Sequence, residues 1–136
     1  MPMSIREVQR FMNGERLASF ATVSPSGRPH VVPVFFTYDS GKVYVQTDRK
    51  SVKVQNLLQN NNVAIAVYGG EEAVIIGGKG HIVDDDEEEF IRRTQDHIRK
   101  YQLKLDENGR DSLGIPLYDK TVRCVVEVTG EHTVFW

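Results

Sequence analysis

The sequence lacks several features that define whole classes of protein. It contains a single cysteine, Cys124, so no disulfide can form within the chain. No apolar run approaches the ~18 residues that a membrane-spanning helix needs. The first residues, MPMSIREV, do not have the basic and then apolar layout of a secretory signal peptide. We therefore expect a cytoplasmic protein that does not enter a membrane.

Neither sign of charge is in large excess. The chain has 17 Lys and Arg residues and 19 Asp and Glu residues, which leaves a formal net charge of -2. Such a balance does not predict binding to nucleic acid or to an anionic membrane through bulk charge. The length of 136 residues and the 40% hydrophobic content suit one domain spanning residues 1–136.

The usual catalytic and nucleotide-binding motifs are also missing. None of the four histidines is spaced from Cys124 as metal ligands would be, so no metal site is expected. The glycines at 77, 78 and 80 lie within a strand pattern and do not match a Rossmann or P-loop fingerprint. Cys124 has no neighbouring base in the sequence, and we expect it to be a buried strand residue.

Hydrophobic spacing predicts three helices. Ser4 and Glu7 form a capping-box pattern before a helical apolar run that ends at Gly14. A second, short helix is expected to begin at Ser51. The acidic run 84–89 precedes apolar residues at helical spacing and then basic residues. Because acid first and base last complements the helix dipole, this run predicts a long amphipathic helix over 84–105.

Segments rich in β-branched and aromatic residues, bounded by turn residues, predict six or seven strands. They span 17–23, 30–38, 43–47, 63–68, 73–83, 121–128 and 133–136. The glycines in the fifth segment indicate a bulge or a close approach of backbones. Mostly sequential strands in one small domain predict a mainly β fold, a closed and largely antiparallel barrel with three helices packed around it.

Hydroxyl and cationic side chains gather where the strand 43–47 gives way to the second helix. The segment reads Thr47-Asp48-Arg49-Lys50-Ser51-Val52-Lys53. A helix N-terminus offers free backbone N–H groups and a positive dipole end, so this segment is a candidate phosphate site. The same composition also fits an ordinary solvated loop in which Ser51 caps the helix.

Pro33 lies inside the apolar segment 30–38 and cannot donate a hydrogen bond to a neighbouring strand. It indicates either a sheet edge or a gap where a ligand ring lies against the strand. Both faces of this segment carry apolar residues, among them Val31, Val32 and Val34. A barrel has one interior, so the other face needs a helix or a second subunit to cover it.

The segments LASFATV (17–23), SGRPHVVPVFF (26–36), VYVQT (43–47), SVKVQNL (51–57) and NVAIAV (62–67) follow in order. This ordered set resembles the pyridoxamine 5'-phosphate oxidase-like superfamily. These are the FMN-binding split barrels, which include flavin-dependent and deazaflavin F420-dependent reductases. The resemblance covers roughly residues 1–83.

The resemblance implies an FMN-binding oxidoreductase that acts on a small molecule, as a homodimer with the cofactor at the subunit interface. It implies that the strand from His30 lines the flavin ring and that Thr47, Ser51 and Lys53 hold the phosphate, assisted by Arg49 or Lys50. The implied cofactor-binding set is His30, Val32, Pro33, Val34, Gln46, Thr47, Arg49, Lys50, Ser51 and Lys53. No catalytic residue is implied, because the cofactor supplies the chemistry.

Departures from the namesake oxidase leave two alternatives open. Val52 stands where the oxidase has an arginine, and His30 or Val31 stands where it has another, which argues against pyridoxamine-phosphate oxidation. One alternative is an F420-dependent reductase, whose cofactor also carries a phosphate. The other is a non-catalytic flavin- or haem-binding protein, since a fold does not settle function. Trp136 either covers the partner's cofactor or closes the barrel.

Overall fold

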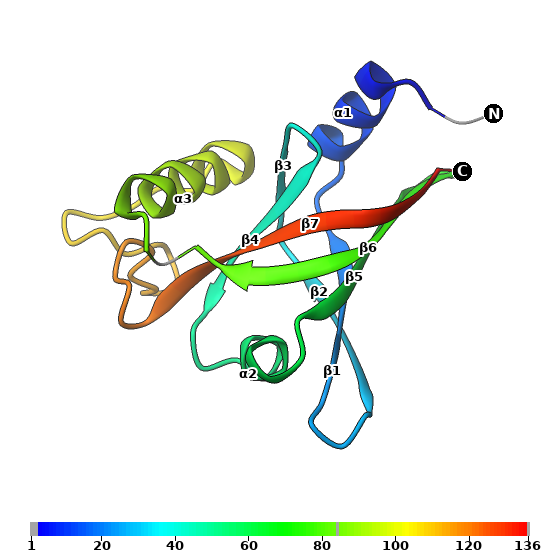
Figure 1. Ribbon diagram of the computed structural model, residues 1–136. Helices are drawn as coiled ribbons and strands as arrows, with labels where there is room; N and C mark the ends of the chain where they lie inside the picture. Colours follow the sequence, from blue (N-terminus) through cyan, green and yellow to red (C-terminus); the bar gives the residue numbers. More distant parts are fainter. Residues whose placement is uncertain (1–2, 84, 136) are drawn as a thin grey trace.

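The computed structural model describes residues 3–83 and 85–135. Asp84 and Trp136, for which we made predictions, lie outside the described residues. The elements in chain order are α1 (Ile5–Gly14), β1 (Ala18–Val23), β2 (Pro29–Val34), β3 (Thr37–Asp39), β4 (Lys42–Asp48), α2 (Val52–Gln59), β5 (Asn62–Gly69), β6 (Glu72–Ile82), α3 (Glu87–Tyr101) and β7 (Arg123–Phe135) (Figure 1). No helix within the described residues is long and apolar enough to cross a membrane.

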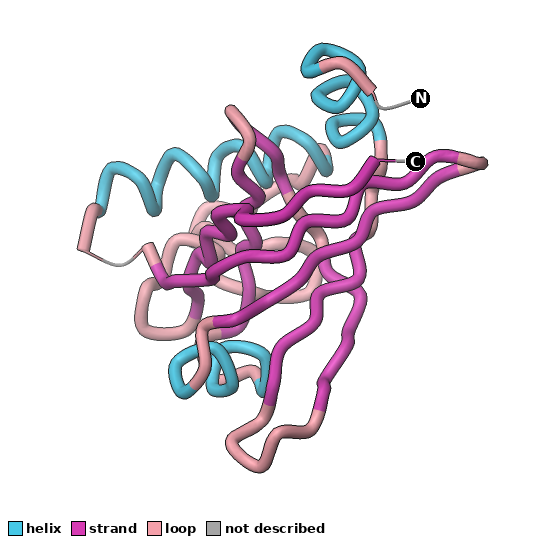
Figure 2. Tube along the Cα trace, turned by 45° about the vertical axis from the view of Figure 1, so that its right-hand side comes forward, coloured by secondary structure: helices cyan, strands magenta, loops and turns pink. Residues whose placement is uncertain are grey.

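The strands form one antiparallel sheet in the order β2-β1-β5-β6-β7-β4-β3. The sheet is strongly curled, as Figure 2 shows. Its two end strands, β2 and β3, follow each other in the chain, yet no ladder joins them among the described residues. The mainly β fold with three helices is confirmed, whereas the closed barrel is wrong: the sheet is an open half-barrel.

The opening arises where the expected strand 30–38 divides in two. Phe36 lies between β2 and β3, and its backbone bonds to a helix side chain instead of a neighbouring strand. The Tyr101 hydroxyl accepts a hydrogen bond from the Phe36 amide at 2.9 Å and lies 2.9 Å from the Phe36 carbonyl. The same hydroxyl lies 2.8 Å from the carbonyl of Arg16, just before β1. Tyr101 therefore satisfies backbone groups that a closed barrel would pair with another strand.

The core fills the concave side of the sheet, and α1 and α2 close its two ends (Figure 1). Phe20 and Ile65 point inward from the centre of the sheet and are almost completely buried. Met12 of α1 and Leu57 of α2 reach the same cluster from opposite ends. Burying one such side chain contributes roughly 1.5–3 kcal/mol, so this cluster fixes both helices to the sheet.

The first turns of α1 and α3 have the capping residues that the sequence predicted. Ser4 and Glu7 form the predicted capping box at α1. The Asp86 side chain accepts a hydrogen bond from the Glu89 amide and begins α3, with acidic residues in its first turn and basic residues in its last. The helix ends at Tyr101, short of the predicted Leu105, because Gln102 adopts the left-handed conformation with φ 52°.

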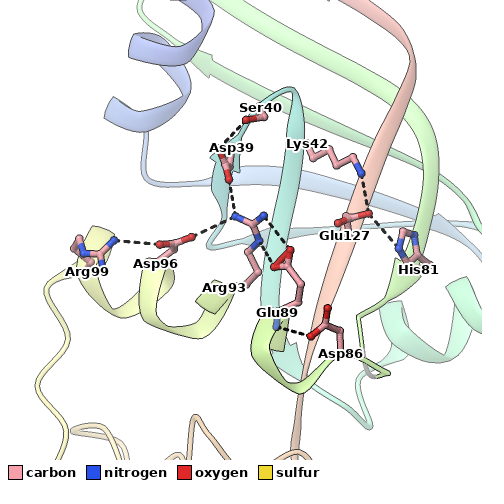
Figure 3. Close-up of polar contacts among 10 residues, drawn as sticks. All are labelled: Asp39, Ser40, Lys42, His81, Asp86, Glu89, Arg93, Asp96, Arg99 and Glu127. Atoms are coloured by element: carbon pink, nitrogen blue, oxygen red, sulfur yellow. Dashed lines mark hydrogen bonds and ion pairs between the residues drawn. The ribbon is translucent and has the colours of Figure 1, made fainter. Parts of the chain in front are cut away.

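A buried arginine attaches α3 to the outside of the sheet beside β3 and β4. Arg93 lies 2.8 Å from a carboxylate oxygen of Asp39, and it also pairs with Glu89 and Asp96 (Figure 3). Its guanidinium lies over the Tyr44 ring, 3.9 Å from the ring centroid. Because these groups satisfy the buried charge from several sides, α3 has a defined position against the sheet.

The last strand is longer than predicted. β7 runs without a break from Arg123 to Phe135, where the sequence indicated two strands separated at residues 129–132. Its pairing with β6 shifts register between Gly77 and Gly78, which leaves Glu131 as an extra residue. A Cβ at Gly78 would overlap the Thr129 carbonyl, so glycine is required there. The predicted bulge and close backbone approach are confirmed.

Candidate functional site

A cavity of about 310 Å³ opens where β2 and β4 end, α2 begins and β7 starts. Five of the predicted residues line it: Pro33, Val34, Gln46, Thr47 and Lys53. Leu17, Phe35, Val45 and Arg123 complete the wall. We call this space the anion cavity. Antiparallel pairing creates it, because Thr47 lies opposite Cys124 and brings the start of β7 beside the end of β4.

Two cations meet in the anion cavity without an acidic residue in its lining. The half-buried Lys53 ammonium has no hydrogen bond or ion pair among the described residues. Burial lowers the pKa of Lys53, and repulsion from Arg123 lowers it further. The pKa of Arg123 is also lowered by burial. Holding two desolvated cations together is unfavourable unless an anion joins them, so the arrangement favours a bound anion.

Polar side chains around these cations are suitably placed for the same role. The Gln46 side-chain oxygen accepts a hydrogen bond from Arg123 Nε at 3.0 Å, which orients the guanidinium. Gln46 Nε2 in turn donates to the Leu117 carbonyl at 2.6 Å. The hydroxyl of the buried Thr47 has no partner among residues 3–83 and 85–135. It is therefore available to donate a hydrogen bond to an anion in the cavity.

Three of the predicted phosphate residues lie outside this lining. Arg49 Nε donates to the Lys120 carbonyl at 2.7 Å, and its Nη2 donates to the Arg123 carbonyl at 3.2 Å. It therefore fixes the turn before β7. Lys50 is exposed, and the Ser51 hydroxyl donates to the Asp48 carbonyl without capping α2.

Of the predicted residues on β2, some line the anion cavity and others do not. Pro33 and Val34 line the anion cavity, whereas Val32 packs against the core. His30 pairs with Thr22 farther along β2 and does not line the cavity, and its Nδ1 atom is buried without a partner among the described residues. Pro33 lies in an end strand of the sheet, as its missing N–H allows.

Sequence reasoning missed Arg123, which lies 70 positions from Lys53 along the chain. Only the pairing of β4 with β7 brings the two together. One signal was present: Arg123 is a cation directly before the apolar run 124–126. Phe35 ends the strand predicted to line the flavin ring but was not in the predicted residue set, and it is 51% exposed beside the cavity.

A second cavity, of about 270 Å³, adjoins the anion cavity. Phe35, Gln46 and Arg123 line both. Its remaining wall comes from Arg16, from α3 and from the segment 103–117, which leads toward β7. We call it the α3 cavity. Within the described part of the chain, no three His, Cys, Asp or Glu side chains gather as a metal site requires.

The convex face of the sheet is apolar and uncovered next to the anion cavity. One row of paired residues runs across the strands as Pro33, Ser19, Ala66, Ile75 and Val134. A second row has Val31, Ala21, Ala64 and Gly77. Small residues at the centre make the face flat, while Val31 is 61% exposed and Val134 is 48% exposed. An apolar face of this kind is typical of a surface that contacts another protein.

Solved structures share this fold. A conserved hypothetical protein from Mycobacterium tuberculosis is 24% identical with a TM-score of 0.81, covering 98% of this chain and 84% of that one. A structure named F420 reductase is 22% identical with a TM-score of 0.71, covering 93% and 94%. HutZ, the heme storage protein from Vibrio cholerae, is 16% identical with a TM-score of 0.76, covering 97% and 92%.

Comparison at the sequence level identifies the family. No sequence among the curated proteins matches the chain. The family model described as pyridoxamine 5'-phosphate oxidase matches residues 5–117, which is most of the sequence. The match confirms the resemblance that was first based on the ordered segments 17–67. The chain therefore belongs to the pyridoxamine 5'-phosphate oxidase family.

Proposed function

We propose that this protein binds FMN through its phosphate and acts as a flavin-dependent oxidoreductase on a small molecule. The observation that carries the proposal is the pair of cations, Lys53 and Arg123, in a cavity whose lining has no carboxylate. A phosphate dianion matches this pair in charge, and its oxygens accept the hydrogen bonds that Lys53, Arg123 and Thr47 have to offer. FMN also suits the family to which the chain belongs.

In this proposal Lys53, Arg123 and Thr47 hold the phosphate, and Pro33 and Val34 border the flavin ring. Arg123 takes the part that the resemblance implied for Arg49 or Lys50, because Arg49 already binds backbone carbonyls and Lys50 is exposed. Gln46 keeps the Arg123 guanidinium turned toward the cavity. The flavin supplies the exchange of hydride or electrons, so the protein needs only to bind and orient it.

We also propose a homodimer in which the convex apolar face of one subunit covers that of the other. Pro33 belongs to both this face and the lining of the anion cavity. A second copy on the face would thus lie at the mouth of the cavity and complete the cofactor site. A self-complementary face is what a two-fold dimer requires, and the flat rows of small residues allow two sheets to approach closely.

The experiment is titration of the purified protein with FMN, followed by the quenching of flavin fluorescence. Lys53→Met removes the charge and keeps much of the side-chain length. It is expected to weaken FMN binding about tenfold or more, because a charge-assisted phosphate contact is lost. Riboflavin, which has no phosphate, should bind weakly and equally to the native protein and to the variant.

Lys50→Met is the matched control, since Lys50 is an exposed lysine in the same segment. It should bind FMN as the native protein does. Equal FMN affinity in Lys53→Met and Lys50→Met would refute the phosphate assignment. The visible spectrum of the protein as purified separates FMN from F420 or haem, and a bound deazaflavin or haem would replace FMN in the proposal.

A further inference from the structure

The α3 cavity holds a histidine whose polar atoms have no protein partner. His97 is 6% exposed and lines the cavity from α3. Neither of its ring nitrogens has a hydrogen-bond partner among the described residues, and Nδ1 is sealed from solvent. Nε2 is not sealed in this way, so it is the ring nitrogen that an occupant of the cavity can reach.

The charge state of His97 limits what that partner can be. Burial, together with the positive charges of Arg123 and Lys100, lowers the pKa of His97 to about 4. Asp111 opposes this change, and its Oδ1 atom accepts hydrogen bonds from the amides of Leu113 and Ile115. The imidazole is therefore neutral near pH 7 and carries one N–H. Because Nδ1 is sealed, Nε2 is the nitrogen through which His97 can donate to an occupant of the cavity.

The aromatic and aliphatic part of the wall suits a flat ring system. Phe35 and Tyr101 lie edge to face with ring centroids 4.9 Å apart, and the His97 ring is 5.2 Å from Tyr101. Leu103, Ile115 and Leu117 add apolar side chains to the lining, and polar or charged side chains come from Arg16, Asp111, Ser112 and Arg123. The volume of about 270 Å³ lies just below the ~300–1,000 Å³ of pockets for drug-sized ligands, which limits the occupant to one or two rings.

We infer that the α3 cavity receives the substrate of the proposed oxidoreductase, and that this substrate is a one- or two-ring compound with a carbonyl-type oxygen bound by His97. The substrate assignment rests on the proposed function. Its position supports this, since Phe35, Gln46 and Arg123 form a wall shared with the anion cavity. Quinones are the simplest members of the class. A quinone would take up two electrons and two protons from a reduced dihydroflavin and leave as a hydroquinone, and the flavin would become oxidised.

The test uses two probes of matched shape. The first is 2,3-dimethyl-1,4-naphthoquinone, which has the carbonyl oxygens and no free ring position for thiol addition. The second is 2,3-dimethylnaphthalene, which lacks those oxygens. Binding of each is measured by calorimetry on cofactor-free protein, so failure of FMN binding does not affect the result. His97→Phe should weaken quinone binding about tenfold and leave binding of the hydrocarbon within about twofold.

Two further variants keep the test decisive. His81→Phe replaces an exposed histidine on β6 and should change neither affinity. Ile115→Trp fills the cavity from segment 103–117 and should abolish binding of both probes, while circular dichroism and a cooperative thermal transition confirm that the variant is folded. An unchanged quinone affinity in His97→Phe, or probe binding that survives Ile115→Trp, would overturn the inference. Loss of FMN binding in the native protein would instead overturn only the proposed function.

Discussion

The side-chain oxygen of Gln46 accepts a hydrogen bond from Arg123 Nε at 3.0 Å, while Gln46 Nε2 donates to the Leu117 carbonyl at 2.6 Å. One residue of β4 thus orients a cation of the anion cavity and also holds the segment that walls the α3 cavity. Few single side chains in the described structure affect both cavities in this way, since only Phe35, Gln46 and Arg123 line both.

Gln46→Leu is expected to weaken FMN binding about three- to tenfold, because Arg123 loses the acceptor that orients it. Fluorescence titration measures the change. The cation itself remains, so the loss should be smaller than that caused by Lys53→Met. If Gln46→Leu binds FMN as tightly as the native protein, the orientation of Arg123 by Gln46 has no part in binding.

The affinity for FMN should decrease at alkaline pH earlier than an ordinary lysine would allow. Burial and the neighbouring Arg123 lower the pKa of Lys53, so it loses its proton below the usual 10.5. The phosphate is already a dianion above pH ~7, so it does not contribute to the change. FMN titration at a series of pH values from ~7.5 up to the usual lysine value of 10.5 checks this. Lys53→Arg should keep its affinity over the same range, because arginine stays protonated.

The parts of the fold that depend on neighbouring residues were predicted well from the sequence. The capping box at Ser4 and the acidic start of α3 act within one helical turn, and both are present. The open barrel and the role of Arg123 depend on contacts between distant parts of the chain. Tyr101 binds Phe36 across 65 positions, and β7 pairs with β4 across more than 70. Propensity and spacing carry no direct information about such pairings.

The same limit applies to the candidate site. Thr47 and Lys53 were predicted because the chain order places a strand end before a helix start, which is a local pattern. Arg49 lies in the same segment and was predicted for the same reason. Its guanidinium instead binds the carbonyls of Lys120 and Arg123. Composition identifies cations near a site, but tertiary contacts decide which of them face the ligand.

Stability should fall as the pH decreases below neutral because of His97. Its pKa is about 4 in the folded protein and about 6.5 when unfolded, so the unfolded chain binds the proton first. The contribution of neutral His97 is fully present above pH ~6.5 and is lost as the pH falls toward 4. The loss amounts to about 2 kcal/mol at pH 5 and about 3 kcal/mol at pH 4.

Urea unfolding at pH 7.5, 5 and 4 measures this dependence, with one pH value above the range in which the histidine titrates and two within it. His97→Gln cannot titrate, so its free energy of unfolding should decrease with pH by that much less. Parallel pH profiles for the native protein and His97→Gln would contradict the assigned burial of the neutral imidazole.

Tyr101→Phe is expected to destabilise the protein by about 1–3 kcal/mol, because the Phe36 amide loses its hydrogen-bond partner in a buried place. Thermal or urea unfolding gives the value. Tyr68→Phe is the control, since Tyr68 is 66% exposed and its change should stay within about 0.5 kcal/mol. Equal stability of the two variants would mean that Tyr101 does not support the break between β2 and β3.

Ala64→Arg tests both the dimer and the place of the cofactor within it. Ala64 lies at the centre of the convex face, opposite Ala21 on one side and Gly77 on the other. An arginine there is tolerated by a single subunit, whose convex face meets water, but two copies would bring like charges together in an apolar contact. Sedimentation equilibrium at micromolar concentration should give a dimer for the native protein and a monomer for the variant. Gln59→Arg, an exposed change on α2, should stay dimeric. A native monomer would contradict the proposed dimer.

If the cofactor lies at the interface, the Ala64→Arg monomer should also bind FMN more weakly. A monomer with full FMN affinity would show that Lys53, Arg123 and Thr47 complete the site within one chain.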